Sequence, residues 1–266
     1  MPANASVLAE PGAPELTLEA AARALAQAQS DLSRAPRLLT RFLGPPSVAS
    51  ALKIAQRHLS CVPTGNTALP KAAEWFLDNF YLIRRVARQV EEELPRGFVR
   101  HLPQLARGPS RGALRIDALA RAFVSRSRLE LDLAGLQRFL CAYQEVSPLT
   151  IAELWALPTF LRASVLQHLV ALLAALHVPL LARDHLSPEG GDPSGAGPSP
   201  QLQLDPSAGV ERSIYALRLL ESIDWKSLFE RSNRVEAILR QDPARIYAQM
   251  DFETCDAYRK GVESVA

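Results

Sequence analysis

The sequence is poor in the residues that mark several fold classes. Its 266 residues include only three cysteines, Cys61, Cys141 and Cys255, which lie far apart and without CxxC spacing. This pattern is typical of buried thiols in a reducing compartment and not of a disulfide framework. Aromatic residues make up 6% of the chain, and β-branched residues are few. Leu and Ala dominate instead, and both are strong helix formers.

Motifs that carry chemistry are also missing. The sequence contains neither GxGxxG nor GxxxxGK[ST] for phosphate binding, and neither HExxH nor another ligand spacing among its five histidines. The N-terminus lacks the basic and apolar regions of a secretory signal. The net charge is +2, with no basic stripe interleaved with aromatics. We therefore predict no catalytic, cofactor-binding or metal-binding residues in this chain and no nucleic-acid partner.

One segment tests whether the chain spans a membrane. From Ala163 to Ala182 about twenty residues pass without Lys, Arg, Asp or Glu, which reaches membrane-spanning length. Gln167, His168, His177 and Pro179 interrupt the segment, and each is costly in hydrocarbon. We interpret it as a buried central helix and expect no direct membrane span.

Hydrophobic periodicity predicts an all-α fold, a multi-helix bundle of about eight to ten helices with a disordered Pro/Gly/Ser linker. The strongest pattern places apolar residues every three to four positions from Phe76 to Leu94. Thr150 and Glu153 form a capping-box sequence at the start of another helix. The main predicted helices are 17–33, 48–60, 71–94, one around 116–124, one capped by Asp132, 150–177, 210–222, 225–240, 242–250 and a last one near the C-terminus.

Composition divides the chain into four parts. Residues 1–16 are Pro- and Ala-rich, and we expect them to be flexible. Residues 17–185 form the predicted helical domain. Residues 186–209 form a linker that is too poor in apolar side chains to bury enough surface to order itself. Residues 210–266 form a C-terminal helical segment that we expect to pack on the first domain.

Charged residues near the strongest helix have two interpretations. Glu74 and Asp78 lie four residues apart and could act as an acid/base pair, although the helix dipole favours carboxylates in a first turn in any case. The run of Arg84, Arg85 and Arg88 is either a solvated face or a surface that docks on a polyanion or another domain.

Aromatic residues offer a second kind of site. Trp75 and Trp155 could stack on sugar rings, but at helical spacing beside apolar residues such side chains more often belong to the core. Tyr81 could join them in contacting a glucan, and Asp78 is a further candidate for docking or glucan contact.

Many short stretches between residues 70 and 262 resemble stretches of one known protein family and occur in the same order. They are Glu74–Phe80, Leu82–Ile83, Leu94–Phe98, Arg100–Pro103, Arg138–Phe139, Ala142–Gln144, Pro148–Ile151, Glu153–Ala156, Asp242–Ala244, Tyr247, Met250–Phe252, Thr254, Asp256 and Tyr258–Arg259. Together they resemble the N-terminal region of bacterial cyclic β-1,2-glucan synthases. The chain departs from the family pattern in three places. Gly108–Ala113 lacks the tyrosine-containing aromatic sequence of the family, and Ala152 replaces a glycine. The linker is also longer than in the family.

The resemblance implies a relationship to very large inner-membrane enzymes that build cyclic β-1,2-glucan from UDP-glucose. Their transferase domain carries metal-binding aspartates and a Gln-x-x-Arg-Trp motif, and neither is present here. The resemblance thus implies a noncatalytic helical leader that is a fragment or the product of a truncated reading frame. Its expected location is the cytoplasm or the cytoplasmic face of the inner membrane.

Three hypotheses follow. In the first, the chain docks on the remaining domains of a synthase through Arg84, Arg85 and Arg88 together with the loop from Leu94 to Pro103, which contains Arg96. In the second, it is a free-standing module that binds β-1,2-glucan through Trp75, Tyr81 and Trp155, or binds another protein. In the third, which has the least support, it is a self-contained enzyme.

Overall fold

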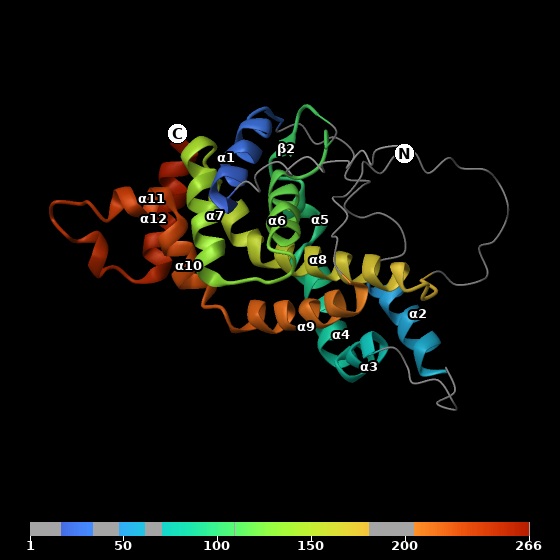
Figure 1. The fold of residues 1–266 in the computed structure, drawn as a ribbon. Helices are drawn as coiled ribbons and strands as arrows, with labels where there is room; N and C mark the ends of the chain where they lie inside the picture. The colour runs from blue at the N-terminus through green and yellow to red at the C-terminus, as the bar shows by residue number, and fades with distance from the viewer. Residues whose placement is uncertain (1–16, 34–47, 62–70, 109, 181–204, 266) are drawn as a thin grey trace, which may run out of the picture.

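The protein is described by a computed structural model that covers residues 17–33, 48–61, 71–108, 110–180 and 205–265. Within these ranges the chain forms twelve α-helices, of which ten have seven or more residues, so the predicted all-α fold is confirmed (Figure 1). The helices are α1 (Leu18–Ala28), α2 (Val48–Ser60), α3 (Lys71–Asp78), α4 (Phe80–Glu93), α5 (Arg96–Val99), α6 (Arg115–Arg126), α7 (Leu133–Val146), α8 (Ile151–Ala175), α9 (Pro206–Ser222), α10 (Trp225–Ser232), α11 (Arg234–Leu239) and α12 (Phe252–Val265), with a 3-10 turn, η3 (Tyr247–Gln249).

Two very short strands accompany the helices. Strand β1 (Leu32–Ser33) pairs antiparallel with β2 (Gln104–Leu105), so that Leu32 lies opposite Leu105. Two residues are too few to produce an alternating pattern, which explains why the sequence predicts no strand.

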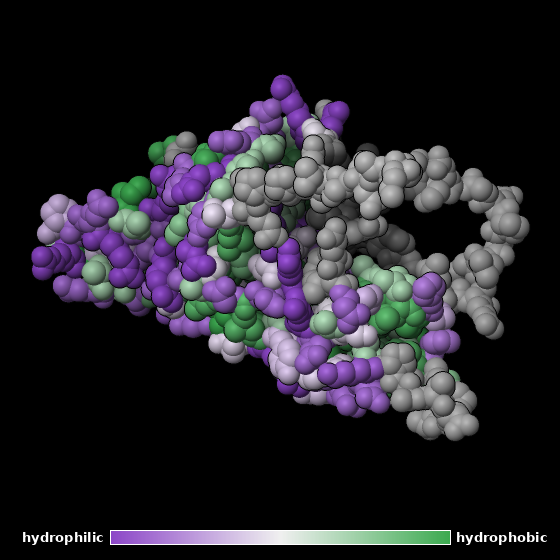
Figure 2. Space-filling model, in the orientation of Figure 1, coloured by the Kyte–Doolittle hydropathy of each residue, from purple (hydrophilic) through white to green (hydrophobic). Residues whose placement is uncertain are grey.

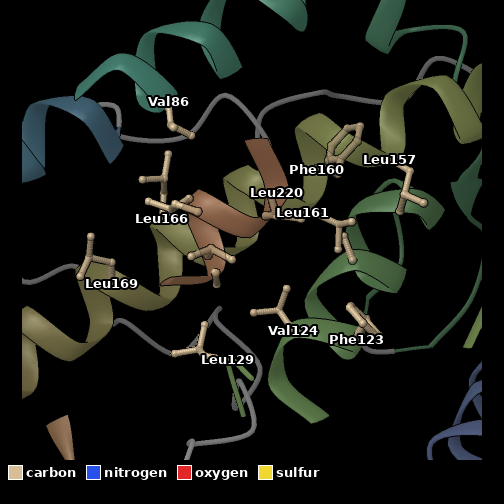
Figure 3. Close-up of a cluster of buried hydrophobic side chains, with 14 of the residues drawn as sticks. Val86, Phe123, Val124, Leu129, Leu157, Phe160, Leu161, Leu166, Leu169 and Leu220 are labelled. Carbon is tan, nitrogen blue, oxygen red and sulfur yellow. The ribbon is translucent and has the colours of Figure 1, made fainter. Parts of the chain in front are cut away.

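Helix α8 is the centre of the bundle. It packs against α2, α4, α6 and α9, and near its N-terminus against α10 (Figure 1). Figure 3 shows Phe160 and Leu166 of α8 in one buried hydrophobic cluster with Val86 of α4, Val124 of α6 and Leu220 of α9. Within the described ranges it is the one helix long and apolar enough to cross a membrane, and 72% of its apolar window is buried in the protein. The predicted buried central helix is confirmed.

Predicted caps form as the sequence indicates. The Thr150 hydroxyl accepts the Glu153 N–H, and the Glu153 carboxylate accepts the Thr150 N–H, completing the capping box of α8. The Thr17 hydroxyl accepts from Ala20 in α1, and Asp132 accepts from Gly135 in α7. Each cap satisfies a backbone donor that has no partner within its own helix.

Two predicted helices are broken at an asparagine. The predicted helix 71–94 divides into α3 and α4 at Asn79, whose side-chain nitrogen donates to the Trp75 carbonyl at 2.9 Å. The predicted helix 225–240 divides into α10 and α11 at Asn233, whose side chain caps the backbone N–H groups of Val235 and Glu236. In both places the asparagine side chain competes with the helical hydrogen bonds of the backbone.

Other helix boundaries also differ from those predicted from the sequence. Helix α1 ends at Ala28 and is capped by Gln29, and the Asp31 carbonyl just before β1 accepts a hydrogen bond from the Ala106 N–H. The predicted helix 242–250 is a turn followed by η3. The Asp242 carboxylate accepts the N–H groups of Ala244, Ile246 and Tyr247 and holds the turn closed.

The predicted linker is mostly outside the described residues, as are the predicted flexible residues 1–16. The described chain resumes at Asp205, which caps α9, and Pro206 occupies the first turn. Helix α9 therefore starts four residues before the predicted Val210. It packs against α8 and α3.

Candidate functional site

The outward face of α4 carries most of the predicted docking residues. Tyr81, Arg84 and Arg88 recur at three- and four-residue spacing, so they share one side of the helix. All three are exposed, and 63% of Tyr81 is accessible. Asp78, at the end of α3, is exposed as well.

The arginines of this face differ in their partners. Arg85 Nη2 lies 2.6 Å from both carboxylate oxygens of Glu221, so it ties α4 to α9. Arg88 pairs with Glu92 one turn along the same helix at 2.7 Å. No ion-pair partner of Arg84 lies among the described residues. The Arg88 pair is fully exposed and holds the side chain weakly.

The adjoining loop contributes less surface than its sequence suggests. Leu94, Val99 and Leu102 are buried, and the segment contains the short helix α5, which begins at Arg96. The Arg96 side chain lies outside the described residues. The exposed residues of this segment are few and include Pro95, Gly97, Arg100 and His101.

The two candidate tryptophans lie in different places. Trp75 is half-buried on α3, with its ring 5.5 Å from that of Tyr215 on α9. Trp155, 39% exposed, stacks on Phe229 of α10 at 4.5 Å and meets Phe252 of α12 edge-on at 5.8 Å. Because α3 and α10 are well separated in Figure 1, the structure does not bring the two tryptophans into one site.

A second group, which the sequence interpretation missed, surrounds Glu236 of α11. Its carboxylate is buried and accepts the Tyr247 hydroxyl at 2.6 Å, Arg259 Nη1 at 2.6 Å and Arg240 Nε at 2.6 Å. Arg259 is also buried, with 1% of its surface exposed. We call Glu236, Arg240, Tyr247 and Arg259 the Glu236 cluster. It joins α11, η3 and α12.

A weak sequence signal for this cluster does exist. Phe252, Cys255 and Arg259 fall on one face of the last helix, and the first two are apolar. An arginine on an apolar face indicates a buried ion pair. Its partner, 23 residues away, is not indicated by any local pattern.

Electrostatics in the cluster favour the charged carboxylate. Burial alone would raise the pKa of Glu236, but hydrogen bonds from Tyr247, Arg259 and Arg240 outweigh it and hold the pKa below its ordinary value. Burial and the hydrogen bond to Glu236 raise the pKa of the Tyr247 hydroxyl, so Tyr247 remains a donor.

The lowered pKa of Glu236 predicts a contribution to acid sensitivity. Its stabilising effect is fully present above about pH 4.5, the ordinary glutamate value, and is lost as the pH falls through the lower pKa of the folded state. In urea unfolding at several pH values, Glu236→Gln should lose less stability than the parent protein as the pH falls below about 4.5. Equal pH-dependent losses in the two proteins would contradict this assignment.

A pocket of about 130 Å³ lies beside the Glu236 cluster. Lys226 and Glu230 of α10, Phe252 of α12 and members of the cluster line it. In the described chain no three or more His, Cys, Asp or Glu side chains gather in a way that could hold a metal ion.

No family model matches the chain. Among curated proteins, it is similar to the cyclic β-(1,2)-glucan synthase NdvB of Rhizobium meliloti (strain 1021), with 25% identity over 276 residues. This chain is a distant relative of that synthase. The similarity covers 81% of the chain but only 10% of NdvB, so the chain spans about a tenth of the relative's length.

Proposed function

We propose that this chain is a noncatalytic helical module, equivalent to the N-terminal region, of an enzyme related to cyclic β-1,2-glucan synthases. Its role is to dock on the adjoining portion of that enzyme. One observation carries the proposal: the similarity extends over 81% of this chain and only a tenth of the synthase. A similarity of that extent fits a part of a large protein better than a separate enzyme.

The outward face of α4 is the docking surface in this proposal. Tyr81, Arg84 and Arg88 give it an exposed aromatic ring beside guanidinium groups, and both residue types are enriched at protein interfaces. Arg85 is excluded from the contact set because its pair with Glu221 serves the contact between α4 and α9. The partner surface should be acidic with an apolar recess.

The cellular location proposed for the module follows from the larger enzyme to which it would belong. An enzyme of this type would use UDP-glucose and lie in the inner membrane, and the module would sit on its cytoplasmic side. The module itself would use no cofactor.

The docking surface can be tested by charge reversal. The chain should bind saturably to a glucan synthase from which the matching segment has been removed. Arg84→Glu combined with Arg88→Glu should weaken that binding by about tenfold or more, because like charges then face each other. Surface plasmon resonance measures the change.

Helix α2 offers a matched control. Lys53 and Arg57 are exposed and four residues apart, as Arg84 and Arg88 are. Lys53→Glu combined with Arg57→Glu changes the net charge equally and should leave binding unchanged. If both double variants weakened binding equally, or if the double variant of α4 did not weaken it, α4 would not be the docking surface.

Glucan binding is the second candidate, favoured by the Trp75 and Tyr215 rings. They lie 5.5 Å apart, and 51% of Tyr215 is exposed, so a sugar could stack beside them. Titration with β-1,2-glucan under tryptophan fluorescence separates the two functions. A saturable change lost in Tyr215→Ala supports glucan binding, and docking alone predicts no saturable change.

A further inference from the structure

The pocket beside the Glu236 cluster is lined by charged groups of both signs. Cationic groups come from Lys226, Arg240 and Arg259, and carboxylates from Glu230 and Glu236. The surface over α11 and α12 is mostly hydrophilic in the view of Figure 2. Whether such a pocket favours an anion or a cation depends on which groups still lack partners.

The carboxylates of the lining are already occupied. Both oxygens of Glu236 accept hydrogen bonds, one from Arg240 and the other from Tyr247 and Arg259. The Oε2 atom of Glu230 accepts from Arg240 Nη2 at 3.3 Å. The negative charges that could attract a cation are therefore largely neutralised by neighbouring arginines.

The cations, in contrast, keep unused donors. The Lys226 ammonium lies 4.4 Å from the centre of the Phe252 ring and has no carboxylate partner among the described residues. A ring face attracts the cation but does not accept strong hydrogen bonds from it. Lys226 and the half-exposed Arg240 thus present free N–H groups at the pocket.

Arg259 adds unsatisfied donors to the buried wall. Its Nε and Nη2 atoms are buried without a hydrogen-bond acceptor, while the guanidinium carbon lies 4.9 Å from the centre of Phe252 and 5.2 Å from that of Phe229. Asp256 Oδ1 is 3.7 Å from Nη2, too far for a hydrogen bond. Buried donors without partners are rare and call for an explanation, such as a bound water or ion.

We propose that this pocket binds a small oxyanion, a phosphate or a carboxylate, between Lys226, Arg240 and Arg259. Charge-assisted hydrogen bonds from guanidinium and ammonium groups are the strong contacts available to such a ligand. A volume of about 130 Å³ is close to that of an engineered cavity of about 150 Å³ that accommodates benzene. The pocket therefore suits an anionic group of about six non-hydrogen atoms or fewer. This proposal does not depend on the docking function.

Calorimetric titration of the full chain with inorganic phosphate, and separately with acetate, tests the proposal at constant ionic strength. At least one anion should bind saturably. Lys226→Met should weaken that binding by about tenfold or more, because it removes a charged hydrogen bond. Lys226 is exposed, so this variant keeps the fold, whereas replacing buried Arg259 endangers it.

Lys53→Met on α2 is the matched control, since Lys53 is an exposed lysine on a different helix. It should bind the anion as the parent protein does. The proposal is overturned if neither phosphate nor acetate binds saturably. Binding that Lys226→Met leaves unchanged, or that Lys53→Met reduces equally, also overturns it.

Discussion

Glu153→Ala is expected to destabilise the protein by about 3–5 kcal/mol, because it leaves a buried arginine without its counter-charge. Glu153 is fully buried and Arg115 is 2% exposed. One carboxylate oxygen accepts Arg115 Nε at 2.7 Å, and the other accepts Arg115 Nη2. The same carboxylate completes the capping box with Thr150. The substitution therefore removes an ion pair and a helix cap together.

Urea unfolding followed by tryptophan fluorescence measures this loss. Glu145→Ala is the control, since Glu145 pairs with Arg23 at the exposed surface and its removal should produce no measurable change. A loss of less than about 1 kcal/mol in Glu153→Ala would show that the buried pair is not a main support of the fold.

Phe160→Ala should have an effect of similar size. Phe160 of α8 is fully buried and belongs to the hydrophobic cluster drawn in Figure 3. Truncation removes apolar contacts and leaves a cavity that the packed helices can only partly close, with an expected loss of about 3–5 kcal/mol. Thermal or urea unfolding measures it.

Tyr81→Ala is the comparison for this prediction. It removes a ring of similar size, but 63% of Tyr81 is exposed, so the change in stability should stay within about 0.5 kcal/mol. Equal losses in the two variants would contradict the placement of Phe160 at the core. Because Tyr81 also lies on the proposed docking surface, the variant separates stability from binding.

Local signals predict much of the fold. The capping box at Thr150, the cap at Asp132 and the apolar content of α8 lie within a few residues of the structure they specify. The breaks at Asn79 and Asn233 are harder to predict, since each asparagine stands in a helical pattern. At Asn79 the side-chain oxygen accepts from Arg218, 139 residues away, so a distant contact helps fix the break.

The candidate sites also differ in whether local sequence or a distant contact determines them. The exposed face of α4 follows from helical spacing, and the sequence places Tyr81, Arg84 and Arg88 on it. The pair of Arg85 with Glu221 depends on the packing of α9 against α4, which no spacing indicates. The Glu236 cluster depends on how α11, η3 and α12 meet, and the sequence alone does not identify it.

The central claim, a noncatalytic module of a glucan synthase, is tested most directly by sequencing the DNA that follows the codon for Ala266. The account predicts a continuing or frameshifted reading frame that encodes membrane-spanning helices and a Gln-x-x-Arg-Trp motif. A stop codon followed by unrelated genes would contradict it and would leave glucan or protein binding by a free-standing helical protein as the better explanation.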